Sequence, residues 1–294
     1  MVAMVVVVTA IAVGYQRLQS TRAASAAARK NASFGADAAA RRLSIDFESL
    51  QGRLSRLAAD PQVTGLFESV SPACVVDFSG SGTLSGHLEI LAADGSIACS
   101  SLPGPIAGGY RAEPWVPASL DRASISAPVI DSRTGNLVVV VTAPIPGHGL
   151  AAAFLDLAAL GRTLGSTFGG PRDLEFLVAT ADGQRAVTRS IDPGRWVGTS
   201  IVDTPFAGSP LDAPGRDLDG RSRYYSLAIV GATGWRVYAG EDRGASLSMA
   251  NDVRRSDLIV GLTFLLVVIS TGFVLSRRIS SPIIALSEQI RAPV

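Results

Sequence analysis

The chain has 294 residues, a length that suits one or two folded domains. Its formal net charge is +1, which excludes the concentrated positive surface of a nucleic-acid-binding protein. The cysteines and histidines (Cys74, Cys99, His87 and His148) are too few and too scattered for a zinc motif, so we expect neither a metal nor a cofactor.

Residues 1–14 are uncharged and apolar apart from Thr9. One interpretation is a signal peptide cleaved near the small residues 23–28, but the positively charged start of such a peptide is absent. The other is a membrane anchor that lacks its beginning, because fourteen residues of helix span only about 21 Å. We expect the anchor, because a second apolar segment at 258–275 fits a protein with two spans.

Residues 15–59 contain no proline and are rich in good helix formers, which predicts a long helix in the region 15–72. Pro61 should end this helix or begin a second short helix that runs to Phe67. One face should be buried, because apolar residues recur at alternating spacings of four and three: Leu43, Phe47, Leu50, Leu54 and Leu57. The alanine-rich part at 23–40 is a weaker core former, and a solvated stalk is the alternative there.

The region 73–168 has strand character. Residues 88–91 and 96–99 are short apolar runs on either side of Asp94-Gly95, which predicts a hairpin. Further strands are expected at 126–130, 137–144 and 151–157, and helices at 115–120 and 158–167.

The region 169–244 repeats this pattern. Both regions begin with Leu-Glu-apolar-Leu, at 88–91 and 174–177, followed by an Asp-Gly pair. Further strands are expected at 185–189, 224–230 and 235–239, and helical composition returns from Glu241. Two related sheet units are therefore predicted.

Residues 258–275 carry no charge and no proline, and a helix of this length rises about 27 Å, close to the apolar thickness of a bilayer. A buried helix of a soluble domain is the alternative. Beyond Arg277, apolar residues at Ile279, Ile283, Leu286 and Ile290 form a heptad seam, and a seam joined to a span suits a parallel dimer.

Residues 277–286, RRISSPIIAL, resemble the opening of a HAMP domain, with its basic start, Pro-Ile pair and following Leu. HAMP domains connect a membrane span to the output of bacterial receptors. The resemblance covers only the first helix of such a domain, so we expect the connector, the second helix and any output module to be missing from this sequence.

The order of elements also resembles the double Cache sensor domains of bacterial receptors, over residues 30–245. It is supported by Asp94-Gly95, Asp182-Gly183 and Gly234-Trp235 before the last strand. The resemblance implies an α+β fold with a long N-terminal helix, a membrane-distal PAS-like unit at 73–168 and a membrane-proximal one at 169–244. Residues 245–276 would be a signalling and transmembrane helix, and 277–294 a partial HAMP domain.

The same resemblance places a ligand site in the distal unit. Arginine can bind a carboxylate with two hydrogen bonds, and aromatic rings can contact an apolar or cationic group. Amino-acid-binding double Cache domains use an aromatic-Arg-Trp cluster and a later Asp, which points to Tyr110, Arg111, Trp115 and Asp156. Arg111 and Trp115 are four residues apart rather than two, and Val129 stands where a tyrosine would be expected. A surface arginine and a core tryptophan are the alternative.

The expected topology puts Cys74 and Cys99 outside the cytoplasm, where disulfides persist, and a disulfide between them is therefore predicted. Two buried free thiols are the alternative.

We expect extracytoplasmic small-molecule sensing and transmembrane signalling, as the input of a histidine kinase or diguanylate cyclase and less so of a chemotaxis module. No catalytic constellation is visible, so the chain is not expected to be an enzyme. It should lie in the bacterial inner membrane, with residues 15–256 periplasmic and 277–294 cytoplasmic. A homodimer is expected through the helices at 15–60 and 277–291. A membrane-anchored binding or scaffold protein without an output is the alternative.

Overall fold

The computed structural model describes residues 2–67, 74, 76–78, 80, 82–104, 108–172, 174–207 and 215–246. Residues 25–243 form one compact unit, whose fold is described below. Among the described residues, no helix combines the length and the apolar character that a membrane crossing requires. The predicted span at 258–275 and the HAMP-like helix after it lie outside the described residues.

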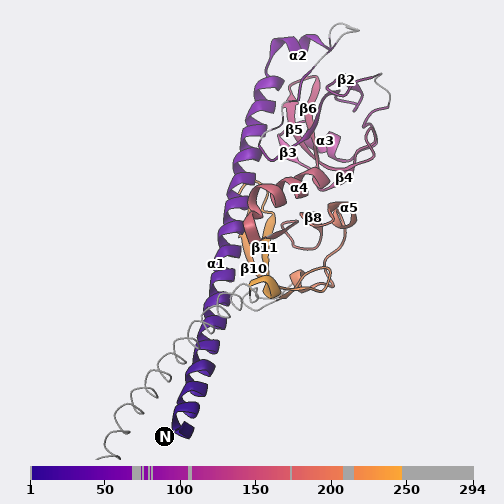
Figure 1. Cartoon of the computed structure of the whole chain (residues 1–294). Coiled ribbons are helices and arrows are strands. Elements are labelled where there is room, and N and C mark those ends of the chain that lie inside the picture. Colours follow the sequence, from indigo (N-terminus) through magenta and orange to yellow (C-terminus); the bar gives the residue numbers. More distant parts are fainter. Residues whose placement is uncertain are drawn as a thin grey trace, which may run out of the picture. The chain divides into compact units, whose positions relative to one another are not determined.

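A single helix, α1 (Val2–Ala58), runs beside both sheets of the unit (Figure 1). It ends earlier than the expected limit of residue 72, because Asp60 caps a separate short helix, α2 (Pro61–Gly65), by accepting a hydrogen bond from the backbone of Gln62. Four members of the predicted apolar stripe, Leu43, Phe47, Leu50 and Leu54, are buried, and the fifth, Leu57, is partly buried against the same core.

The alanine-rich part of α1 is not a solvated stalk. Five alanines within 23–40 are buried (Ala28, Ala32, Ala36, Ala39 and Ala40). Gly35 lies so close to the second sheet that a Cβ atom there would be 2.8 Å from Leu174. Small side chains allow the helix axis to approach the sheet, and burial by close approach does not require large apolar residues.

The first sheet is antiparallel, with strand order β2-β1-β6-β5-β3, and β4 also pairs with β5. Its strands are β1 (Gly86–Ala92), β2 (Ile97–Ser100), β3 (Ser124–Ile125), β4 (Val129–Ile130), β5 (Leu137–Ile145) and β6 (Gly149–Asp156). The single strand expected at 126–130 is wrong, because Pro128 between β3 and β4 has no amide hydrogen for a ladder bond.

The second sheet has the order β8-β7-β11-β10-β9, and its first four strands repeat the arrangement β2-β1-β6-β5 of the first. Its strands are β7 (Glu175–Ala179), β8 (Ala186–Arg189), β9 (Gly215–Arg216), β10 (Ser222–Ile229) and β11 (Arg236–Asp242). Glu241 lies in β11 rather than in a helix, because pairing with β10 extends the strand to Asp242.

The two predicted hairpins are confirmed. Gly95 and Gly183 have φ values of +81° and +73°, as their turns require. Each hairpin also has a register irregularity at the same distance from its turn, between Ile90 and Leu91 in one and between Val178 and Ala179 in the other. The two sheets are thus built in the same way.

Short helices connect these strands. They are α3 (Trp115–Ser119), α4 (Leu157–Phe168), α5 (Pro193–Trp196), η1 (Gly170–Arg172) and η2 (Pro205–Ala207). The helices predicted at 115–120 and 158–167 correspond to α3 and α4, whereas α5 and β9 were not predicted. Asp156 ends β6 and caps α4 through a hydrogen bond from the amide of Ala159.

One apolar core joins α1 to the inner faces of both sheets. Phe47 of α1 packs edge-to-face on Trp235 beside the second sheet, at a centroid distance of 5.2 Å. The same core contains Leu88 and Ile90 of β1. The helix therefore shares one core with both sheets.

Three polar side chains of α1 also fix its position. The buried carboxylate of Asp46 accepts hydrogen bonds from the amide and hydroxyl of Thr83, just before β1, at 2.9 and 2.7 Å. Ser44 accepts one from the amide of Gly231 at 2.8 Å, and Asn31 donates one to Glu241 at 2.7 Å. These bonds set the height of the helix relative to each sheet.

Two glycine-to-alanine substitutions should change stability in opposite directions. At Gly161 in α4, a Cβ atom would lie 2.2 Å from the carbonyl oxygen of Arg189, so Gly161→Ala should cost about 1–3 kcal/mol despite the better helix propensity. At Gly52 in α1, the nearest atom is the Arg56 side chain at 3.9 Å, so Gly52→Ala should gain about 1 kcal/mol. Urea unfolding measures both changes, and equal effects would contradict this packing of α4.

A disulfide joins Cys74 to Cys99 of β2 across 25 residues, with Cα atoms 5.5 Å apart. Replacing both cysteines by alanine should lower the free energy of unfolding by about 3 kcal/mol, because the open loop gains entropy in the unfolded chain. Reduction of the natural protein should cause the same loss and should not affect the variant. Two free thiols in the unreduced protein would contradict the disulfide.

Candidate functional site

A buried polar cluster lies on the face of the first sheet that points away from α1. Because side chains alternate along a strand, Leu88 and Ile90 of β1 face the helix while His87 and Glu89 face the other way. On that outer face Phe154 of β6 is flanked by Tyr110 and Trp115, at centroid distances of 4.8 and 5.8 Å. The polar groups therefore lie beside an aromatic floor.

Glu89 is completely buried, and only one of its two oxygens is used. Its Oε1 atom accepts hydrogen bonds from Nη1 of Arg133 at 2.5 Å and from the hydroxyl of Ser100 at 3.1 Å. Oε2 has no hydrogen-bond partner among the described residues. Burial raises the pKa of this carboxyl, although the hydrogen bond and the charge of Arg133 oppose the increase.

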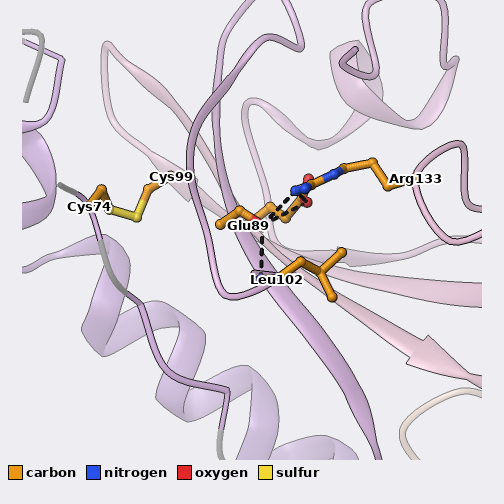
Figure 2. Close-up of a disulfide and its surroundings, with 6 residues drawn as sticks. Cys74, Glu89, Cys99, Leu102 and Arg133 are labelled. Atoms are coloured by element: carbon orange, nitrogen blue, oxygen red, sulfur yellow. Dashed lines mark hydrogen bonds and ion pairs between the residues drawn. A yellow bond between two sulfur atoms is a disulfide. The ribbon is translucent and has the colours of Figure 1, made fainter. Parts of the chain in front are cut away.

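Figure 2 shows the ion pair between Glu89 and Arg133 beside the disulfide. Ser100, which bonds to both of them, directly follows Cys99 in β2. The disulfide therefore fixes the strand that supplies one of the cluster's donors.

Asp131 is buried at the turn between β4 and β5, and both of its oxygens are used. Oδ1 accepts hydrogen bonds from the hydroxyl of Tyr110 at 2.7 Å and from the amide of Arg133 at 3.1 Å, and Oδ2 accepts from the amide and hydroxyl of Thr134. Burial alone would raise the pKa of Asp131, but the bonds from Thr134 and Tyr110 lower it below its usual value.

His87 completes the cluster. Its ring stacks on Phe154 at 4.6 Å, and its Nε2 atom lies 3.7 Å from Oδ2 of Asp131 and 3.9 Å from Oε1 of Glu89. Nε2 is buried and has no hydrogen-bond partner in the described part of the chain. Burial lowers the pKa of His87, against the opposing charge of Asp131. We call His87, Glu89, Ser100, Tyr110, Asp131 and Arg133 the Glu89 cluster.

The structure brings together two of the four predicted ligand residues. Tyr110 and Trp115 are buried neighbours, with ring centroids 5.6 Å apart. Arg111 instead lies on the surface with 71% of its side chain exposed, and it pairs with Asp94 of the hairpin turn at 3.1 Å. Asp156 accepts hydrogen bonds from the helix amide of Ala159 and, at 3.3 Å, from Asn136.

Sequence reasoning missed Glu89, Asp131 and Arg133 as site residues. The available signal was a glutamate at the centre of an otherwise apolar strand, in the repeated Leu-Glu motif. Asp131 and Arg133 belong to a turn, and nothing in their sequence context shows which strand they contact.

The second sheet carries a comparable group, which we call the Glu175 cluster: Glu175, Arg189, Asp217, Asp219, Arg223 and Tyr225. All of them are buried except Asp219, whose side chain is 33% exposed. Here both oxygens of the carboxylate are used. Oε1 of Glu175 accepts from Nε of Arg189, and Oε2 accepts from the hydroxyl of Tyr225 and lies 2.8 Å from Nε of Arg223. Asp217 pairs with Arg223 at 2.9 Å, and Asp219 with Arg189 at 2.8 Å.

The two glutamates are not in the same register. Glu89 lies five residues before Asp94 of its turn, whereas Glu175 lies seven residues before Asp182. Both separations are odd, so both side chains lie on the outer face. The repeated motif therefore places a buried glutamate on corresponding strands, β1 and β7, but at different distances from the turn.

An open groove of about 620 Å³ lies elsewhere, between α1 and residues 167–171. Its lining includes Phe34, Phe168 and Leu174, and Lys30 is its one charged residue. The described part of the chain holds no group of three or more His, Cys, Asp or Glu side chains that could bind a metal. We take the Glu89 cluster as the stronger candidate, because its unpartnered buried atoms include a carboxylate oxygen, Oε2 of Glu89, beside aromatic rings.

Comparison with known proteins identifies the fold. No family model and no curated protein matches the sequence. The extracellular domain of rpHK1S-Z16, a proposed histidine kinase, aligns with a TM-score of 0.51 at 15% identity, covering 72% of this chain and 92% of that one. The ligand-binding domain of the Pseudomonas fluorescens chemoreceptor CtaA, solved with L-leucine, aligns with a TM-score of 0.51 at 15% identity, covering 71% and 92%. This chain has the fold of those sensor domains.

Neutralising the two carboxylates of the Glu89 cluster should have different effects. The folded-state pKa of Asp131 is lowered, so its ionised form stabilises the fold above its usual pKa of 3.8, and Asp131→Asn should cost about 1.5–3 kcal/mol at pH 7. The folded-state pKa of Glu89 is raised above 4.5, so ionised Glu89 destabilises the fold, and Glu89→Gln should leave stability at pH 7 unchanged or increased.

Urea unfolding at a series of pH values tests both changes. The deficit of Asp131→Asn should shrink as the pH falls through the folded-state pKa of Asp131, because that carboxyl then becomes neutral in the natural protein as well. A loss of stability in Glu89→Gln as large as that in Asp131→Asn would show that Glu89 is a structural group.

Proposed function

We propose that this chain is the input region of a transmembrane signalling protein, and that the Glu89 cluster binds a small molecule outside the cytoplasm. The observation that carries the proposal is the difference between the two clusters. Both oxygens of Glu175 are engaged, whereas Oε2 of Glu89 is buried without a partner among the described residues. Such an atom costs free energy in the folded protein, and a bound ligand can recover it.

The similarity in fold also supports a small-molecule site. The chemoreceptor domain with this fold was solved with L-leucine, a molecule small enough for one buried site. The aromatic floor of Tyr110, Trp115 and Phe154 offers the apolar surface that such sites provide, next to a few polar groups. The disulfide at Cys74 and Cys99 suits an oxidising compartment such as the periplasm.

The membrane part of the proposal comes from the sequence. Residues 1–14 and 258–275 would be the spans, and the RRISSPIIAL segment would lead into a HAMP domain on the cytoplasmic side. The output would be a histidine kinase or diguanylate cyclase. An open reading frame that continues beyond Val294 into a second HAMP helix supports this arrangement, and a stop codon there favours the scaffold protein instead.

A homodimer would form along α1. Phe34 and Ile45 expose 69% and 60% of their surface, although both are large and apolar. They lie eleven residues apart, which is close to three full turns, so they share one face of the helix. A second copy of that face is the partner that we propose. A ligand would then bias the output only by its different affinity for the two signalling states.

A thermal-shift screen of the purified chain against amino acids, organic acids and amines tests the site. Tyr110→Phe should weaken binding of any compound found at least tenfold, because it removes the hydroxyl that orients Asp131. Tyr225→Phe is the matched control, since it removes an equivalent buried hydroxyl bonded to Glu175. If Tyr225→Phe abolished binding and Tyr110→Phe did not, the site would lie on the second sheet.

A further inference from the structure

The charges of the Glu89 cluster do not balance. Glu89 and Asp131 are two carboxylates, Arg133 supplies one positive charge, and Tyr110 and a neutral His87 supply none. When both carboxyls are ionised, the cluster carries one net negative charge inside the fold. A buried charge without a partner is costly, so the group that fills this site should bring a positive charge.

The hydrogen bonds show where that charge belongs. Both oxygens of Asp131 already accept hydrogen bonds, and Oε1 of Glu89 accepts from Arg133 and Ser100. The open acceptor is Oε2 of Glu89, and the residue itself has an exposed fraction of 0%. His87 supplies a second unpartnered atom, Nε2, in the same cluster, and it is also buried.

We infer that the Glu89 cluster takes a cationic donor such as a protonated amine, which donates to Oε2 of Glu89, and that a proton on His87 competes with this cation. The inference rests on the proposed function, because it names the class of ligand for the same site. An ammonium group has three N–H donors, so it can serve Glu89 and a neutral His87 together.

The competition follows from the groups that surround His87. Glu89 lies on its own strand, Asp131 and Arg133 lie on the turn before β5, Tyr110 comes from the loop before α3, and Phe154 stacks from β6. A proton on His87 would place a positive charge within 4 Å of both carboxylates, at 3.9 and 3.7 Å. It would supply the charge that the ligand otherwise brings, so cation affinity should fall as the pH falls.

Arg133 limits the charge of the ligand that the site can take. It is the most exposed charged member of the cluster, with 10% of its side chain accessible, whereas Glu89 has none. Its guanidinium already occupies one oxygen of Glu89, so the site accepts a cation beside an existing one. This arrangement favours a single positive charge on the ligand over two.

The test uses the purified full chain and three matched series of probes: n-alkylamines, n-alkanols and n-alkanoates of one to four carbons. Titration calorimetry and thermal shift at pH 8 should detect the amines and neither of the other series. Glu89→Gln should weaken amine binding at least tenfold. Asp94→Asn is the control, because it removes a negative charge from an exposed residue of the same unit without touching the cluster.

The pH dependence is a second readout. Amine affinity should fall between pH 8 and pH 5.5, while the amines themselves stay protonated, and the fall should be smaller in His87→Gln, which keeps only the contribution of Glu89. Amine binding that is unaffected by Glu89→Gln, or a pH dependence that is equally large in His87→Gln, would overturn the inference.

Two further outcomes separate this inference from the proposed function. If alkanoates bind, amines do not, and Tyr110→Phe abolishes that binding, the site is correct and the assignment of a cation is wrong. If an amine binds to Tyr110→Phe and to Glu89→Gln as tightly as to the natural protein, the proposed site itself is wrong. The cationic assignment is then wrong as well.

Discussion

The structure depends on the packing of one helix face against two sheets. Leu43, Phe47 and the alanines at 36, 39 and 40 of α1 belong to the same core as the inner faces of β1 and β7. A sheet with one apolar face needs a cover, and here a single helix covers two. The outer faces are free of that helix, and this is where both polar clusters lie.

The two sheets carry similar polar clusters on their outer faces, but the hydrogen bonding of the central glutamate differs. Each places a glutamate on the outer face of its first strand and supplies arginine, aspartate and tyrosine around it. The Glu175 cluster has two arginines at the carboxylate, and both oxygens are engaged. The Glu89 cluster has one arginine and an open oxygen. The buried atoms without a hydrogen-bond partner thus differ in kind: in the Glu175 cluster they are donors, Nη1 and Nη2 of Arg189, and in the Glu89 cluster they include an acceptor, Oε2 of Glu89. An open buried acceptor costs free energy that a bound donor can repay.

Contacts link the Glu89 cluster to α1 and, through α1, to the second sheet. Glu89 lies between Leu88 and Ile90, which pack on α1, and Asp46 of α1 bonds to Thr83 just before that strand. A shift of β1 therefore changes contacts with the helix directly. The helix in turn shares its core with the second sheet through Phe47 and Trp235.

The sequence by itself determined the long helix, its buried stripe, both Asp-Gly hairpins and most strands, because these follow from periodicity and turn chemistry along a short stretch of chain. It also correctly paired Cys74 with Cys99. Only the tertiary structure showed that small alanines are core residues, that Glu241 continues a strand, and that Arg111 lies at the surface while Arg133 enters the cluster. Arg133 and Glu89 are 44 residues apart in the sequence. Only the folding of the β4–β5 turn against β1 and β2 brings Nη1 of Arg133 to 2.5 Å from Oε1 of Glu89.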